Sequence, residues 1–147
     1  MGQIEIKYAS YSISELEGKN KELVEQAFAA CGTSYAPYSN FNVGAAALLD
    51  DGTIITASNQ ESEVFPSGMC AERCLLYRHQ ATQNKIVALA IASSPSEREC
   101  YPCGACRQVI VDTQNRQQQP IRVIMAGAGT ATIIDDATLL LPFTFKL

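Results

Sequence analysis

Two short segments of this chain carry side chains whose types and spacing could do chemistry together. Residues 70–73 read Cys-Ala-Glu-Arg, and residues 102–108 read Pro-Cys-Gly-Ala-Cys-Arg-Gln. Their three cysteines, Cys70, Cys103 and Cys106, can bind one zinc ion as thiolates and leave its fourth tetrahedral position open. An open position is typical of catalytic zinc, whereas a structural site fills it with a fourth protein ligand. The two segments therefore predict a catalytic centre with one Zn²⁺ per chain.

Glu72 is the candidate catalytic residue of this centre. It follows Cys70 by two residues. This spacing is too short for both side chains to bind the same ion easily, but it allows Glu72 to contact a molecule bound at the open position. A Cys-x-Glu segment followed by Pro-Cys-x-x-Cys is the signature of zinc-dependent nucleobase deaminases. In such a site Glu72 would accept a proton from water, protonate N3 of a cytosine ring, and carry a second proton to the departing amine.

Arg73 is the candidate for tuning the metal ion. Three thiolates give the zinc centre a net negative formal charge, which weakens it as a Lewis acid. Arg73 lies three residues after Cys70 and can donate hydrogen bonds to the cysteine sulfurs, drawing off part of that charge. Helix N-termini, expected at both segments, stabilise thiolates in the same sense. We interpret Arg107, in contrast, as a solvated helix residue.

The chain resembles the cytidine deaminases of the small, three-cysteine zinc type, over about residues 20–145. Beyond the two cysteine segments, residues 37–46 (Pro-Tyr-Ser-Asn-Phe-Asn-Val-Gly-Ala-Ala) and residues 59–61 (Asn-Gln-Glu) resemble segments of that family. The C-terminal residues 140–145 (Leu-Leu-Pro-Phe-Thr-Phe) resemble the family's last segment.

The resemblance implies roles for five further residues, all of them in substrate binding. Phe41 matches the aromatic residue that packs against the pyrimidine. Asn59 and Glu61 match the side chains that bind the ribose hydroxyls, for which an amide and a carboxylate supply a donor and acceptors. The backbone N–H of Ala71 would meet the base carbonyl. Phe145 matches an aromatic residue that helps to close the pocket.

Residues 62–69 depart from the family pattern. They read Ser-Glu-Val-Phe-Pro-Ser-Gly-Met, and they should border the sugar side of the pocket. Three functions therefore stay open. The first is deamination of cytidine and deoxycytidine to uridine and deoxyuridine. The second is deamination of a modified cytosine nucleoside, as in the similar blasticidin S deaminases. The third is a zinc-binding scaffold without catalysis, against which the presence of Glu72 argues.

Composition bounds the partners of the protein. The 147 residues suit one domain, residues 1–147. A net charge of −4 and a pI of about 4.9 argue against nucleic acid, whose binding needs clustered Lys and Arg, and favour a small, neutral nucleoside. The N-terminal residues lack a signal-peptide pattern, and the apolar runs are too short to span a membrane. We therefore expect a cytoplasmic protein with free or metal-bound thiols and no membrane partner.

The hydrophobic pattern predicts an α/β domain: a three-layer α/β/α sandwich with a mixed sheet of about five strands. Helices are expected over 14–31, with a capping box of Ser14 and Glu17, over 70–80, over 102–114 and briefly over 136–141. Strands are expected over 41–49, 53–57, 86–92, 121–126 and 131–134. The Asp51-Gly52 pair predicts a hairpin turn. The glutamine-rich residues 114–119 are interpreted as a loop without particular significance.

Assembly is the last expectation. The family resemblance implies a homotetramer in which neighbouring subunits complete the pockets. The apolar tail over residues 139–145 also favours assembly, because a soluble monomer has little reason to expose it. The alternative is that the tail caps its own core.

Overall fold

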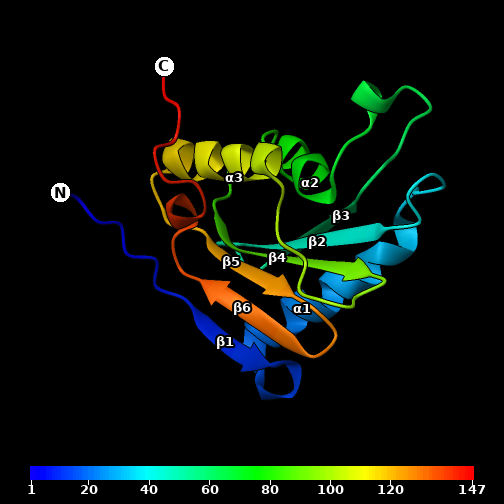
Figure 1. The fold of residues 1–147 in the computed structure, drawn as a ribbon, viewed down its shortest axis with the longest axis horizontal. Coiled ribbons are helices and arrows are strands. Elements are labelled where there is room, and N and C mark those ends of the chain that lie inside the picture. Colours follow the sequence, from blue (N-terminus) through cyan, green and yellow to red (C-terminus); the bar gives the residue numbers. More distant parts are fainter.

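A single mixed sheet organises the molecule, which is described here over all residues, 1–147, from a computed structural model. The strand order is β1-β6-β5-β4-β2-β3 (Figure 1). The pair β4 and β5 is parallel, and every other neighbouring pair is antiparallel. The strands are β1 Ala9–Ser12, β2 Asn42–Leu49, β3 Ile54–Ser58, β4 Ile86–Ser94, β5 Arg122–Ala126 and β6 Thr130–Ile134.

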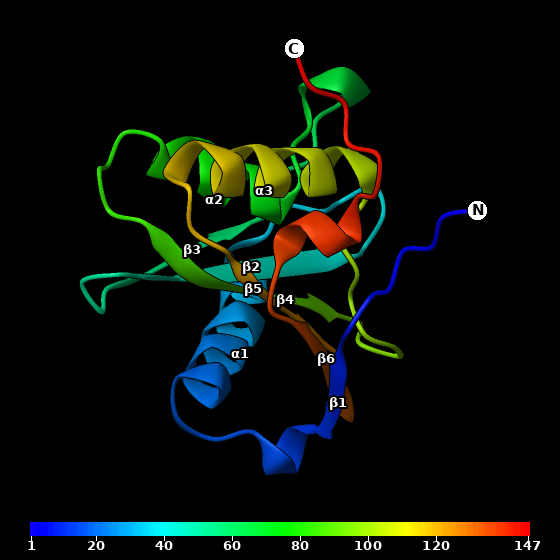
Figure 2. The ribbon, with the colours of Figure 1, turned by 90° about the vertical axis from the view of Figure 1, so that its left-hand side faces the viewer.

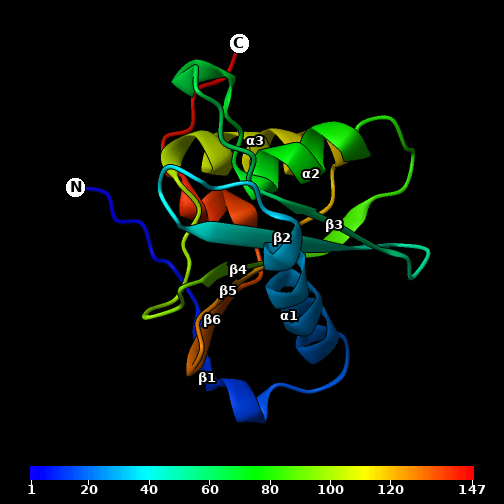
Figure 3. The same ribbon diagram turned by 90° about the vertical axis from the view of Figure 1, so that its right-hand side faces the viewer.

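Helices cover both faces of this sheet. Helix α1 packs on one face, and α2 and α3 lie side by side on the other (Figures 2 and 3). The helices are α1 Gly18–Ala30, α2 Ala71–His79 and α3 Gly104–Gln117, and short 3₁₀ turns span Ile13–Glu15, Cys31–Thr33, Phe65–Ser67 and Ala137–Leu140. The predicted three-layer α/β/α sandwich is confirmed. No helix is both long and apolar enough to cross a membrane.

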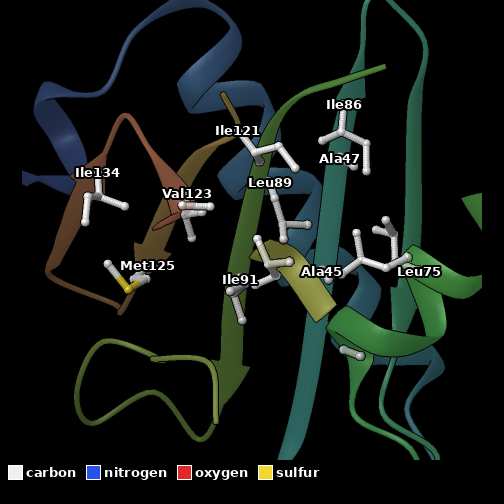
Figure 4. Packing of buried hydrophobic residues seen from close by; sticks show 14 of the residues in the cluster. Ala45, Ala47, Leu75, Ile86, Leu89, Ile91, Ile121, Val123, Met125 and Ile134 are labelled. Carbon is white, nitrogen blue, oxygen red and sulfur yellow. The ribbon is translucent and has the colours of Figure 1, made fainter. Parts of the chain in front are cut away.

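Alternation along the central strands produces two separate cores. Successive strand residues point to opposite faces, so Ala45 of β2 and Leu89 of β4 face α2 and α3, whereas Ala46 and Ala90 face α1. Figure 4 shows the first core, with Leu89 and Ile91 packed between the sheet and the helices. The α1 side is lined mostly by alanines, which lets that helix approach closely.

Gly44 of β2 marks the point of closest approach. A Cβ atom added there would lie 1.9 Å from the carbonyl oxygen of Ala27 in α1. Only glycine therefore fits between the strand and the helix backbone at this position. The glycine within the predicted segment 37–46 thus has a packing role that fixes α1 against β2.

The hairpin at Asp51-Gly52 forms as predicted. Gly52 has a φ of +88°, which glycine adopts without the steric cost of a side chain. Its N–H donates to the Leu49 carbonyl at 3.0 Å, and the Asp51 carboxylate accepts from the Thr53 N–H at 2.9 Å. The turn joins β2 and β3 in an antiparallel pair.

The N-terminal region corrects the predicted start of the first helix and the position of its capping box, and it adds one strand to the sheet of about five that was expected. The first helix begins at Gly18, not at residue 14, because residues 13–15 form a 3₁₀ turn. The capping box lies two residues earlier than expected, with Glu15 accepting from the Ser12 N–H at 2.8 Å. The sheet has six strands because Ala9–Ser12 adds to the β6 edge. This short strand, Ala-Ser-Tyr-Ser, is exposed along its whole length and buries no apolar face, and it is not among the expected strands.

The glutamine-rich segment is another correction, because α3 continues through it to Gln117. The Gln114 side-chain oxygen accepts from the N–H groups of Ile121 and Ala137, each at 2.9 Å. The Gln117 amide pairs with both the N–H and the carbonyl of Ile86, at 3.0 and 2.8 Å. These amides satisfy backbone groups at the first residues of β4 and of the last 3₁₀ turn, and at the residue just before β5. They fasten α3 to the starts of β4 and β5.

Arg107 is not a solvated helix residue as predicted. Its Nε donates to the Pro102 carbonyl at 2.8 Å, and its Nη1 donates to the Leu140 carbonyl at 3.1 Å. The half-buried guanidinium therefore ties the C-terminal segment to the loop that precedes α3.

Candidate metal centre and active site

Two helix N-termini carry the predicted metal ligands. Cys70 is the N-cap residue of α2, and Cys103 is the N-cap residue of α3. Cys106 follows in the first turn of α3. The first N–H groups of a helix have no intrahelical acceptor, and the positive end of the helix dipole stabilises anions there. The fold thus places all three cysteines at the N-terminal ends of two helices.

The three sulfurs form a compact cluster. Their Sγ atoms lie within 4.8 Å of one another, and Cys70 Sγ lies 3.9 Å from Cys103 Sγ. Tetrahedral zinc with Zn–S bonds of about 2.3 Å requires sulfur separations of about 3.8 Å. The cluster therefore fits one zinc ion, and its soft sulfur donors suit zinc better than magnesium or calcium.

Charge around the cluster favours ligation. A hydrogen bond from Cys106, together with the Arg73 guanidinium, lowers the pKa of Cys70 to about 5. Arg73 Nη2 lies 3.4 Å from Cys70 Sγ, which is the contact expected from the sequence. Hydrogen bonding to Cys70 and burial raise the pKa of Cys106. Binding of a metal ion to these sulfurs would release their protons.

Glu72 lies in the first turn of α2, beside the sulfur cluster. Its side chain is only 4% exposed. Burial is the main cause that raises the pKa of this carboxyl above its ordinary value, partly offset by hydrogen bonding that includes Cys106. A carboxyl in this setting can hold a proton at neutral pH more readily than an exposed one.

A cavity of about 460 Å³ opens beside Cys70 and Arg73. It brings together residues from the loops before α2 and before β2. Its lining includes Tyr38, Asn59, Glu61, Phe65, Cys70 and Arg73. Its volume lies in the range typical of small-molecule sites.

Asn59 and Glu61 line this cavity and also build its wall. The Asn59 side-chain oxygen accepts from the Val43 N–H at 2.8 Å, and its nitrogen donates to the Phe41 carbonyl at 2.9 Å. One N–H of that amide is left for a ligand. The Glu61 carboxylate accepts from the backbone and hydroxyl of Ser39, which lowers its pKa.

The remaining predicted contacts are distributed differently. Ala71 is fully buried at the start of α2. Phe41, 42% exposed, does not line the cavity beside Cys70 but an adjacent hollow of about 430 Å³ that includes Cys100. Phe145 is 72% exposed and lines neither. One chain alone therefore does not bring Phe41 and Phe145 into the cavity.

Two aromatic residues that the sequence analysis did not single out line the cavity instead. Tyr38 and Phe65 meet edge to face, with ring centroids 6.3 Å apart. Tyr38 belongs to the Pro-Tyr-Ser run and Phe65 to the unusual residues 62–69. Both residues lie in loops that the sequence places near the site. An aromatic residue in such a loop is a signal that could have identified them as pocket residues.

The other thiols and the single histidine stay away from the cluster. Cys31 is buried and points at the carbonyls of Ala27 and Ala92. His79 is buried at the end of α2, where its Nε2 lies 2.5 Å from the Asn84 carbonyl. No fourth protein ligand joins the three sulfurs, as a centre with an open position requires.

Comparison with known sequences identifies the family. Residues 17–119 match the model described as the cytidine and deoxycytidylate deaminase zinc-binding region. A cytidine deaminase of Halalkalibacterium halodurans is 38% identical over 128 residues, which is 78% of this chain and 96% of that protein. A cytidine deaminase of Sporosarcina psychrophila is also 38% identical, over 70% of this chain and 71% of the relative.

Solved structures agree with the sequence comparison. The cytidine deaminase of Burkholderia pseudomallei superposes with a TM-score of 0.76 at 34% identity, over 84% of this chain and 97% of that one. The enzyme of Mycobacterium tuberculosis gives 0.70 at 30% identity, over 89% and 100%. The sulfur cluster, the fold and these similarities lead to one assignment. The chain belongs to the cytidine and deoxycytidylate deaminase family.

Proposed function

We propose that this protein is a zinc-dependent hydrolase that converts cytidine and deoxycytidine to uridine and deoxyuridine, and that residues 1–147 act as one domain. Water replaces the amino group of the base, and ammonia leaves. The observation that carries the proposal is the three-sulfur cluster with the buried Glu72 carboxyl beside it, next to a cavity of nucleoside size.

The chain supplies the parts of this reaction. Cys70, Cys103 and Cys106 would hold the zinc ion, which when bound acts as a Lewis acid toward water. Glu72 would take a proton from that water, give it to N3 of the base, and later carry a proton to the amine. Its burial supports this role, because a raised pKa lets the carboxyl hold the proton between the two transfers. Arg73 would limit the negative charge on Cys70.

Binding of the nucleoside is assigned to the cavity and its surroundings. Asn59 and Glu61 would bind the sugar hydroxyls, using the amide N–H left free and the remaining lone pairs of the carboxylate. The Ala71 N–H would meet the base carbonyl, and Phe41 would pack on the ring. The acidic Glu61 and the net charge of −4 disfavour a phosphorylated substrate.

Two alternatives are less well supported. The relatives do not support deamination of a modified cytosine nucleoside, because they are named cytidine deaminases. A scaffold without catalysis has no use for a carboxyl buried beside the metal cluster, since burying such a group costs stability.

Assembly and location complete the proposal. We infer a homotetramer, because only the first part of the apolar tail packs on the chain's own core and its two phenylalanines stay exposed. Leu139 and Leu140 pack on the core, but Phe143 is 95% exposed and Phe145 is 72% exposed. A neighbouring subunit would cover them and receive Phe145 near its cavity. A cytoplasmic location agrees with six cysteines that are all free of disulfides.

A substrate panel tests the proposed activity. Zinc-loaded protein should release ammonia from cytidine and deoxycytidine, with a kcat/KM at least about tenfold above that for CMP, since no basic cluster is available to neutralise phosphate. Blasticidin S and single-stranded DNA should react more slowly still. Ammonia detection and the loss of cytidine absorbance measure the rates. A preference for CMP or for blasticidin S would contradict the proposal.

Sugar binding can be tested separately from the chemistry. Glu61→Gln should raise the KM for cytidine about 10- to 100-fold, because a hydrogen bond to a charged group is lost, while zinc content stays unchanged. Asn59→Ala should act in the same direction but also lower stability, because it removes the bonds to Val43 and Phe41.

A substrate without sugar hydroxyls is the matched control for that experiment. For 2′,3′-dideoxycytidine, Glu61→Gln and the parent protein should differ little, because the substrate has lost the partner of Glu61. An equal loss on both substrates would place Glu61 in a purely structural role.

A further inference from the structure

The first residues of the chain leave the body of the molecule as an extended segment. Residues 1–8 precede β1 and point away from the sheet in all three ribbon views (Figures 1, 2 and 3). We call residues 1–8 the arm. The family match begins at residue 17, so the arm lies before the region that this chain shares with the family model. It continues directly into β1, which is the end strand of the sheet and has one unpaired edge.

The arm exposes apolar side chains with the period of a β-strand. Ile4, Ile6 and Tyr8 are 51%, 45% and 67% exposed. They alternate with Glu5 and Lys7, so an extended arm places three apolar side chains on one face and two opposite charges on the other. An exposed apolar strand next to an open sheet edge is a site for pairing with another chain.

The order of these residues is self-complementary. We infer that the arms of two copies of this chain pair as antiparallel strands centred on Ile6. In that register Ile6 lies opposite Ile6, each Ile4 lies opposite Tyr8, and each Glu5 lies opposite Lys7. Every apolar residue then meets an apolar residue and every charge meets its opposite, and both kinds of cross-strand pair are stabilising.

The same register uses the open edge of β1. Continuing the pairing by three positions places Met1, Gly2 and Gln3 of one copy along Tyr11, Ser10 and Ala9 of the other. Backbone groups of β1 that face away from β6 would then find partners. The two sheets would join across a two-fold axis, which is the symmetry that identical copies adopt most often.

In each molecule, the apolar face of the arm lies beside a hollow in the protein surface. Tyr8 and Ser10 line a hollow of about 710 Å³ whose walls include the apolar Met125 and Leu140 and several charged or polar side chains. The apolar face of the arm is therefore on the α3 side of the sheet, because Met125 belongs to the core beneath α3. A second copy seated on the arm would place its own Ile4, Ile6 and Tyr8 on this side of the sheet. The inference does not depend on the proposed activity.

Disulfide trapping in the zinc-loaded, full-length protein tests the register. Ile6→Cys should give a covalent dimer on treatment with diamide, because position 6 faces itself across the axis. Ile4→Cys alone should give little dimer, since its own copies lie about 13 Å apart in this register. A mixture of Ile4→Cys with Tyr8→Cys should form the mixed dimer. The parent chain, with its own six thiols, is the blank for background oxidation.

Charge exchange tests the pairing rule. In the Ile6→Cys background, Glu5→Lys places like charges opposite each other and should lower the dimer yield about tenfold at low salt. Lys7→Glu should do the same. A mixture of the two variants should restore the yield, because each charge then meets its opposite. Zinc content and the melting temperature should stay at the parent values in every variant, which reports that the fold is intact.

Two results would overturn the inference. One is the absence of an Ile6→Cys dimer under conditions in which the variant keeps its zinc and its fold. The other is an Ile6→Cys dimer yield that does not change with the charges at positions 5 and 7 and that Ile4→Cys alone equals. Such a result would indicate random collisions or docking of the arm elsewhere.

Discussion

Replacing Glu72 with Gln should lower kcat for cytidine by about 10²- to 10⁴-fold, the usual contribution of a positioned general acid–base. The amide keeps the size and buried position of the side chain but neither accepts a proton from water nor delivers one to the base. Ligation is separate, because the three sulfurs that form the cluster belong to Cys70, Cys103 and Cys106. Zinc content and thermal stability should therefore stay near the parent values.

Glu63 offers the matched control for that change. It is an exposed carboxylate on the loop that precedes α2, so Glu63→Gln removes the same charge without touching the cluster. Its kcat should equal that of the parent. Near-parent turnover of Glu72→Gln, measured on protein with one zinc per chain, would show that another group carries the proton.

Replacing Cys106 with Ser should remove both zinc and activity. Cys106 is fully buried in the first turn of α3, and a serine hydroxyl there does not supply the thiolate that zinc requires. The two remaining sulfurs would bind the ion far more weakly, so purified protein should hold well under about half a zinc per chain. Turnover should fall by at least about a thousandfold. Metal analysis and ammonia release measure the two losses.

Cys74 is the control for the loss of a thiol. It lies one helical turn after Cys70 in α2, and its sulfur faces the Met69 carbonyl. Cys74→Ser should keep zinc and activity. Chelation of the parent enzyme should abolish turnover, and added zinc should restore it. A Cys106→Ser protein that still bound one zinc tightly would mean that a different residue completes the site.

The parts of the site that the sequence determined are local. Cys70, Glu72 and Arg73 fall within one turn at the start of α2, and Cys103 and Cys106 fall at the start of α3. Helix geometry and N-terminal capping follow from neighbouring residues, so spacing alone predicts which side chains share an end of a helix. The hairpin at Asp51-Gly52 and the α/β layering follow from local patterns for the same reason.

Tertiary structure decided the features that depend on contacts between distant residues. The pairing of β1 with β6, the capture of Ile121 and Ala137 by Gln114, and the edge-to-face contact of Tyr38 with Phe65 each join segments with no shared local pattern. In the sequence, a run of polar glutamines is typical of a loop. The role of the Gln114 amide becomes visible only when the fold brings to it the backbone groups that it binds.

The composition of the pocket also depends on contacts between distant residues. The sequence named Phe41, Asn59, Glu61 and Phe145 as substrate contacts, and the fold placed Asn59 and Glu61 on the cavity, Phe41 in the adjacent hollow and Phe145 in solvent. Local spacing determines which side chains stand together on one element. Which elements face each other across a cavity is set by the packing of the whole chain, because many weak and distant contacts must be satisfied together before any one of them is stable.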